Sequence, residues 1–308
     1  MDKIINLLAM TVSMSTPFLL CVMGGLYAQR AGVFNIALEG IMNIGAFGCI
    51  VFTLLTRSIA LGGILGVCMS VLITAIFIFF AVKLKSNAII IGIAVNLVSS
   101  SVLPFLMQAF YKSRSSLIAT DIIDPQKMKL DIPILRSIPV LGDIFNNQTP
   151  LTYLSFVLVA VLTVVMFKTK FGIYVRVTGE NEEAAKAIGI KVDIIRCAAL
   201  ILSAVTCGLA GINLSMESLG MYTMNMTANR GFICLSAIVC GKRQPIRSAL
   251  YALLFGLAKA LQIMLTNVVD SVTASLIGML PYLTILVVLL VTEIPATVRN
   301  TLRIFQDS

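Results

Sequence analysis

Residues 59–82 read IALGGILGVCMSVLITAIFIFFAV, an unbroken apolar stretch without a charged side chain. A helix needs about 20 mostly apolar residues to cross the hydrocarbon core of a bilayer. The stretch therefore predicts a membrane-spanning helix, and the fold class of the whole chain depends on how often such runs recur.

Comparable apolar runs recur along the chain. They lie near residues 5–28, 33–55, 87–111, 151–168, 196–216, 248–268 and 273–292. A shorter run near 227–241 is either a tilted short span or a re-entrant segment. The pattern predicts an all-α, polytopic transmembrane bundle of about eight to ten spans, with a broken or re-entrant segment, in one domain over residues 1–308.

The composition supports a lipid environment and excludes several classes of function. Hydrophobic residues make up 58% of the 308 residues and charged residues only 12%, against roughly 25% charged in soluble proteins. The net charge of +9 is not accompanied by a basic stripe with stacking aromatics, so we expect no nucleic-acid partner. Without histidine, and with seven cysteines lacking a C-x-x-C spacing, we expect no metal site, no cofactor and no catalytic residues.

The distribution of basic residues suggests an orientation, because Lys and Arg concentrate in cytoplasmic loops. Clusters occur at Lys83 and Lys85, throughout residues 168–196, at 242–247, and at Arg299 and Arg303. We assign all four to the cytoplasmic side. The Asp- and Pro-containing loop 112–150 is predicted to be extracytoplasmic, whereas the side of the N-terminus stays open.

Small residues recur every four positions in three of the runs. Such ladders let helices approach closely in lipid, where burying leucine against leucine gains little. They are Gly62, Gly66 and Ser70; Ser203, Cys207 and Gly211; and Ala252, Gly256 and Ala260. We expect a compact bundle with these residues at helix–helix contacts.

Polar residues inside apolar runs mark candidate positions of a solute path. Asn35, Glu39 and Asn43 recur every four residues, so on a helix through 33–55 they share one face. The alternative is that Glu39 lies near the headgroups and is simply solvated. Asn96 suits either a polar, uncharged solute or hydrogen bonds between helices. Lys259 lies near the middle of its run, and we hypothesise that it pairs with Glu39 or another carboxylate.

The cytoplasmic loop 169–195 carries a short helix signal in GENEEAAKAIGI, residues 179–190. Asn181 is a good N-cap, acidic residues suit the first turn, alanines favour a helix and Gly189 ends it. A helix of about two turns is marginal alone in water, so it docks either on another protein or on the headgroups. The chain lacks a G-x-x-x-x-G-K-[ST] phosphate loop, so any ATP would be bound by another chain.

The order and spacing of several motifs resemble a known family. Glu183-Ala184-Ala185 followed by Gly189 resembles the EAA-x-x-x-G core of the coupling helix in permease subunits of bacterial ATP-binding-cassette importers. RAGVFNIALEG (30–40), TGENEEAA (178–185), RGFI (230–233) and LFGLAKALQ (254–262) resemble the branched-chain amino acid and simple-sugar permeases. The residues of these motifs are most similar to those of nucleoside permeases served by a lipoprotein receptor.

The resemblance implies partners and site residues. Expected partners are ATPase subunits, a second permease chain (identical or a sister), an extracytoplasmic substrate-binding lipoprotein, a small-molecule substrate and membrane lipid, in a bacterial cell membrane. The residues expected to couple to the ATPase are Glu180, Glu182, Glu183, Ala184, Ala185, Ile188 and Gly189. Those expected along the path are Asn35, Glu39, Asn43, Asn96 and Lys259. Relatives tend to have an acidic residue where this chain has Lys259.

Alternatives to a nucleoside importer remain open at this point. Simple-sugar and riboflavin permeases are similar enough to be confused with it. From a different class, a stand-alone secondary transporter or channel would use Glu39 and Lys259 as an ion relay. A membrane-embedded lipid transferase would need a clustered catalytic set, which the sequence does not display, and a scaffold protein would tolerate changes in the loop at Glu183 and Gly189.

Overall fold

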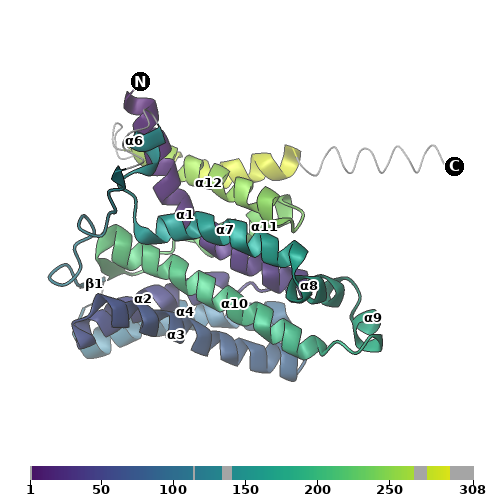
Figure 1. Ribbon diagram of the computed structural model, residues 1–308. Coiled ribbons are helices and arrows are strands. Elements are labelled where there is room, and N and C mark those ends of the chain that lie inside the picture. The colour runs from purple at the N-terminus through teal and green to yellow at the C-terminus, as the bar shows by residue number, and fades with distance from the viewer. Residues whose placement is uncertain (1, 114, 134–140, 267–275, 292–308) are drawn as a thin grey trace.

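The computed structural model describes residues 2–113, 115–133, 141–266 and 276–291, which form a helical bundle (Figure 1). Its longer helices are α1 (Asp2–Arg30), α2 (Leu38–Thr56), α3 (Ile59–Ile78), α4 (Ala88–Tyr111), α7 (Pro150–Lys168), α10 (Val192–Ile212) and α12 (Pro245–Thr266). The shorter ones are α6 (Leu141–Phe145), α8 (Lys170–Glu180), α9 (Glu182–Ala187) and α11 (Arg230–Cys240). The π-helical turns η1 (Phe79–Lys83) and η2 (Asn213–Leu219) extend α3 and α10.

Seven helices in the described part of the chain are long and apolar enough to cross a membrane, and two shorter apolar helices are α11 and Leu280–Val291. With a rise of 1.5 Å per residue, α11 is only about 16 Å long, roughly half of the hydrocarbon thickness. The predicted polytopic bundle is confirmed. The short length of α11 favours the interpretation that the run near 227–241 is a re-entrant segment and not a tilted span.

The interior of the bundle is formed by α1, α2 and α10. In their most apolar windows 61%, 78% and 67% of the residues are buried, against 22% for each of the segments containing α3, α4 and α7. Those three outer segments are the more apolar, with hydropathies of 2.7, 2.2 and 2.2. The most apolar helices therefore lie outermost, which is the arrangement expected where lipid replaces water around the protein.

The predicted small-residue ladders lie at close helix contacts. A Cβ at Gly211 would lie 2.2 Å from the carbonyl oxygen of Met42, and one at Gly256 would lie 2.5 Å from the Cβ of Ser15. Close approach of this kind replaces the hydrophobic driving force that helices lack in lipid. The contacts join α10 to α2 within the interior of the bundle, and they join the less buried α12 to α1.

The bundle has two distinct ends. At one end, here the β end, β1 (Ser116–Ile118) pairs antiparallel with β2 (Met221–Thr223), with Leu117 opposite Tyr222. At the other end, here the α9 end, α8 and α9 project beyond the long helices (Figure 1). The N-terminus lies toward the β end, on the left of Figure 1.

The basic clusters in the described part of the chain gather at the α9 end. Lys83 and Lys85 line one cleft together with Lys186 and Lys191. Arg30 Nε donates to the carbonyl oxygen of Arg243 over 2.6 Å, which brings the 242–247 cluster to the same end. Arg299 and Arg303 lie outside the described residues.

The helix predicted over 33–55 begins later than the sequence suggested. Residues 31–37 form turns and irregular chain, and α2 starts at Leu38. Gly32 ends the preceding helix with φ of +85°, a left-handed conformation that glycine adopts without steric cost. The expectation that Asn35, Glu39 and Asn43 share one helical face is therefore wrong for Asn35. The predicted run 273–292 overlaps residues outside the described part.

Candidate functional site

Glu39 lies buried in the first turn of α2 and accepts two backbone hydrogen bonds from the start of α11. Its Oε1 accepts from the N–H of Asn229 over 2.9 Å, and its Oε2 accepts from the N–H of Gly231 over 2.6 Å. The first N–H groups of a helix have no partner within the helix, and the helix dipole favours negative charge there. Glu39 thus caps α11 from a different element, which excludes the alternative of a merely solvated carboxylate.

The approach of α11 to Glu39 depends on unusual backbone near its start. Asn225, Ala228 and Asn229 have φ of 58°, 44° and 61°, in the left-handed region that alanine rarely occupies. A Cβ at Gly231 would lie 2.4 Å from the backbone nitrogen of Glu39. The sequence therefore places a residue without a side chain where the two backbones meet.

Asn43 and Asn96 are the two other predicted path residues next to Glu39. Asn43 Oδ1 accepts from the hydroxyl of Tyr222 in β2 over 2.9 Å. Asn96 of α4 accepts from the N–H of Gly40 over 2.8 Å and donates to the carbonyl oxygen of Ile36 over 3.0 Å. Asn96 thereby satisfies backbone groups at the start of α2. Of the two predicted roles for Asn96, the structure shows the hydrogen bonds between helices.

These three residues also line one cavity, here the polar cavity, of about 250 Å³. Its lining comprises Glu39, Asn43, Ile93, Asn96, Leu97, Ser99, Ser100, Asn225, Thr227, Asn229 and Phe232. Carboxylate, amide and hydroxyl groups face a few apolar side chains, a composition that suits a small solute with several hydrogen-bonding groups. Sequence reasoning missed segment 225–229, whose polar residues resemble those of an ordinary loop.

Lys259 and Asn35 lie outside the lining of the polar cavity. Lys259 Nζ donates to Gln262 Oε1 over 2.8 Å and lines a separate cavity of about 140 Å³ with Arg230. Asn35 is buried, and its Oδ1 accepts from the N–H of Ala37. The hypothesised pair between Lys259 and Glu39 is wrong: both carboxylate oxygens of Glu39 are occupied by backbone N–H groups, and no ion pair joins the two among the described residues.

A second buried carboxylate, Glu217, was not anticipated from the sequence. It lies in η2, where its Oε1 accepts from the N–H of Leu151 at the start of α7 over 3.1 Å. Its Oε2 accepts from Asn213 Nδ2 over 2.8 Å. The only local sequence signal is Pro150, which predicts the start of a helix because proline is favoured at the first helical position. Nothing in sequence spacing links that helix start to a residue 66 positions away.

The loop at the α9 end folds as predicted around residues 181–189. Asn181 Oδ1 accepts from the N–H of Ala184 over 3.0 Å, which makes it the N-cap of α9. Gly189 has φ of +83° and ends the helix. The loop also contains α8, which the sequence analysis did not foresee.

Two ion-pair systems tie this loop to the end of α1. Glu182 pairs with Lys186 over 2.6 Å and with Arg196 over 2.7 Å, and these cations lower the pKa of Glu182 from 4.5 to about 2. Arg196 Nε also donates to the carbonyl oxygen of Ala31 over 3.2 Å. Arg30 lies 3.8 Å from the carboxylate of Glu180. Only six residues lie between Ala31 and Leu38, where α2 begins, so the loop contacts the segment that leads to Glu39.

Most of the predicted coupling residues face outward. Ala185 is fully buried, whereas Glu180, Glu183, Ala184 and Gly189 are exposed. Ile188 is 70% exposed. A projecting apolar side chain between charged neighbours is a feature of protein contact surfaces.

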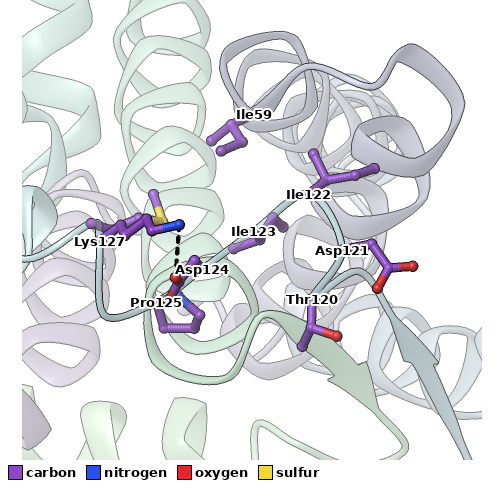
Figure 2. A pocket seen from close by; sticks show the side chains of 9 residues that line it. Ile59, Thr120, Asp121, Ile122, Ile123, Asp124, Pro125 and Lys127 are labelled. Atoms are coloured by element: carbon purple, nitrogen blue, oxygen red, sulfur yellow. Dashed lines mark ion pairs between the residues drawn. The ribbon is translucent and has the colours of Figure 1, made fainter.

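The β end carries a further cavity of about 510 Å³ beside the start of α3 (Figure 2). Residues 120–128 form one wall and Ile59 contributes the other. Asp124 pairs with Lys127 over 3.5 Å, while the carboxylate of Asp121 points away from that pair in Figure 2. Within the described part of the chain, no group of three His, Cys, Asp or Glu side chains could hold a metal ion.

The sequence also matches a family of transport proteins. Residues 7–289 match the model of the branched-chain amino acid transport system / permease component family. The chain belongs to this permease family. The permease is thus a multi-pass integral membrane component of an ABC transporter, and its family is a non-enzymatic transport component.

Three named relatives match most of the length of the permease. It is 34% identical to the nucleoside ABC transporter permease protein NupC of Lactococcus lactis over 89% of this chain and 88% of that protein. It is 31% identical to the guanosine ABC transporter permease protein NupQ of Bacillus subtilis over 82% and 80%. It is also 31% identical to the putative glucose ABC transporter permease protein TsgC13 of Haloferax volcanii over 84% and 77%.

A solved structure shares the fold of the permease. A chain of PsaBC from Streptococcus pneumoniae in complex with Fab superposes with a TM-score of 0.52 over 91% of this chain and 89% of that one, at 17% identity. At that identity the similarity concerns the fold alone.

Permeases of ABC transporters of this family work with ATPase subunits and a substrate-binding protein, which are therefore partners of this chain.

Proposed function

We propose that this permease forms the translocation path of an ABC importer for nucleosides. The observation that carries the proposal is the identity of 34% to a nucleoside permease over 89% of the chain. A second relative is named for guanosine. We propose further that two permease chains, identical or sisters, enclose the path and that the substrate-binding protein is a lipoprotein.

The chemistry of the polar cavity supports a nucleoside as the solute. A nucleoside is uncharged and carries sugar hydroxyls together with donors and acceptors on the base. Glu39, Asn43, Asn96 and two serines offer matching groups around a cavity of about 250 Å³. Since substrates in transporters bind near irregular or broken helices, the start of the re-entrant α11 beside Glu39 is a suitable place. The predicted roles of Asn35 and Lys259 in the path stay predictions.

The orientation proposed here places the α9 end in the cytoplasm. The basic clusters near Lys83, Lys186 and Arg243 gather there, which agrees with the positive-inside rule. Loop 112–150 then lies outside the cell, together with the N-terminus of α1. The cavity around Asp121 and Asp124 is where the substrate-binding protein would dock.

In this proposal α9 transmits force from the ATPase. The exposed side chain of Ile188 and the surface around Ala184 would contact the ATPase subunit. Movement of α9 would reach Arg196 through Glu182, and the main chain at Ala31 through Arg196. Because Ala31 lies just before α2, displacement there shifts Glu39 relative to α11 and changes access to the polar cavity.

Reconstitution tests the proposal directly. The permease, its ATPase and its receptor are placed in liposomes, and uptake of labelled nucleosides, pentoses and riboflavin is compared with and without ATP. We expect ATP-dependent uptake of nucleosides only. ATP-dependent uptake of a pentose or riboflavin instead would reassign the substrate, while uptake by the permease without ATPase would identify a secondary transporter.

Variants of the loop test the coupling role. Ile188→Asp places a charge on the surface proposed to contact the ATPase. Ile246→Asp, on a side chain that is 61% exposed at the start of α12, serves as the control. We expect Ile188→Asp to abolish ATP-dependent uptake while the bundle stays folded. Unchanged uptake with Ile188→Asp would favour a scaffold role for the loop.

A further inference from the structure

A basic cleft lies at the α9 end, where the last turn of the α3–η1 helix meets the start of α10. The cleft, here the lysine cleft, has a volume of about 450 Å³. It is lined by Lys83, Lys85, Lys186, Ile190, Lys191, Val192, Asp193 and Ile194. Four lysines and one aspartate leave its lining with a net charge of +3.

Three of the four lysines lack an anionic partner within the part of the chain that the structure describes. Lys186 is held by Glu182 over 2.6 Å, whereas Lys83, Lys85 and Lys191 form no ion pair with described residues. They come from two segments that are more than 100 positions apart in the sequence. Mutual repulsion opposes this gathering, so an anion in the cleft would stabilise it.

Exposed apolar side chains border the same lysines. Leu84, between Lys83 and Lys85, is 54% exposed, and Ile194 beside Asp193 is 58% exposed. A ligand that satisfies both features has a negatively charged head and an apolar tail. A soluble phosphate ion would use the lysines and leave these two side chains in water.

We propose that the lysine cleft binds an anionic phospholipid, with its phosphate on Lys83, Lys85 and Lys191 and its acyl chains against Leu84 and Ile194. The inference rests on the proposed function in one respect, since it requires the α9 end to face the cytoplasmic leaflet. Lysine is an effective point charge for phosphate groups, and basic clefts beside membrane helices attract anionic headgroups.

The position of the cleft gives the lipid a role in coupling. Lys191 directly precedes α10, and Lys186 belongs to α9, so the cleft joins the proposed ATPase contact to the end of the α3–η1 helix. A bound phosphate neutralises the lysines that otherwise repel one another across this junction. The lipid therefore fixes α9 relative to the bundle and increases ATP-driven uptake.

The test compares lipid binding and activity in matched variants. The triple variant K83Q/K85Q/K191Q removes the unpaired charges of the cleft. The control K3Q/K112Q/K129Q removes three exposed lysines outside both the lysine cleft and the cavity around Asp121, and so changes the net charge equally. Phosphatidylglycerol retained by each purified permease is measured by native mass spectrometry, without ATPase. Receptor-stimulated ATPase activity is measured for the assembled transporter in phosphatidylcholine nanodiscs with and without phosphatidylglycerol.

We expect the cleft variant to retain phosphatidylglycerol about tenfold more weakly than the control. Phosphatidylglycerol should raise the ATPase activity of wild type and control several-fold, and the cleft variant should lose most of that increase. Equal lipid retention by the two variants, or wild-type activity that does not respond to phosphatidylglycerol, overturns the proposal.

Two further outcomes also contradict it and identify the alternative. Stimulation by inorganic phosphate in pure phosphatidylcholine would make the cleft a site for a soluble anion. Loss of ATPase assembly by the cleft variant in every lipid would make it an ATPase contact. Failure of the proposed function itself gives a different pattern, in which wild-type permease retains the lipid but binds no ATPase in any membrane.

Discussion

Glu39 and Glu217 are two buried glutamates that both cap the start of another helix, yet their partners differ in kind. Glu39 accepts from two backbone N–H groups of the segment 229–231. Glu217 accepts from one backbone N–H of α7 and one side-chain amide, that of Asn213. A side-chain amide can rotate to present its oxygen instead of its nitrogen, whereas a backbone N–H always donates.

The difference in partners predicts which of the two glutamate carboxylates can be replaced by an amide. The site of Glu39 requires two acceptors and borders the polar cavity. The site of Glu217 requires one acceptor, because its second partner can adapt. We therefore assign Glu39 to the transport mechanism and Glu217 to the stability of the bundle, and the following experiments examine that distinction.

Separating α11 from Glu39 should have the largest effect. Gly231→Ala adds a Cβ that would lie 2.4 Å from the backbone nitrogen of Glu39, so the two elements must move apart. We expect loss of uptake in liposomes with the protein still inserted. Gly63→Ala is the matched control, because a Cβ there meets nothing within 4 Å. Normal uptake with Gly231→Ala would show that the contact of Glu39 with α11 is not needed.

Glu39→Gln should come next in effect. The introduced amide can accept from only one of the two N–H groups, and a buried donor without a partner costs about 1–3 kcal/mol. We expect uptake to fall by about tenfold or more. The parallel variant Glu217→Gln should keep near-normal uptake, because Asn213 can rotate toward the new amide. Equal losses in the two variants would remove the distinction between the glutamates.

Glu217→Ala should affect stability more than transport. The variant leaves the N–H of Leu151 and the amide of Asn213 without their acceptor. We expect the unfolding temperature to fall by roughly 2–4 °C for each kcal/mol lost, measured by thermal denaturation in detergent. Glu217→Gln should recover most of the loss, and no recovery would mean that charge, not acceptor geometry, matters at this position.

Glu182 should show the smallest effect at neutral pH, because Glu182 and its partner Lys186 are exposed to solvent, and ion pairs at the surface contribute little. Its pKa is lowered to about 2 by Lys186 and Arg196. A lowered pKa means that its stabilising contribution is complete above about 4.5 and is lost as the pH falls toward 2. Because thiol protonation slows labelling equally in every background, we expect labelling of a cysteine introduced at Ile188 to become faster over this range relative to the same cysteine in a Glu182→Gln background. A ratio of the two rates that stays constant between these pH values would contradict the prediction.

Much of the fold could be predicted from local sequence. The apolar runs predicted the helices because each run is long enough to cross a bilayer by itself. The caps at Asn181 and Gly189 were predicted because a cap acts within three or four residues. The start of α2 was placed too early, since the preference of residues 33–37 for a turn competes with an apolar composition that resembles a helix.

The candidate site was less predictable. Glu39 could be identified because a carboxylate stands out inside an apolar run, but its partners could not. The pairing with Lys259 was a reasonable inference from opposite charges, and it failed because the start of α11 offers two N–H groups that are closer. Segment 225–229 lines the polar cavity and Tyr222 donates to Asn43, and no sequence pattern pointed to either.

The sequence alone determined that the chain spans the membrane, where most of its long helices begin and end to within about five residues, and which loop forms a short capped helix. These properties depend on hydrophobicity and on contacts between near neighbours. Only the tertiary structure decided which groups Glu39 and Glu217 cap, and which lysines gather in one cleft. Those contacts join residues as many as 192 positions apart, and a chain encodes them only through the packing of the whole bundle.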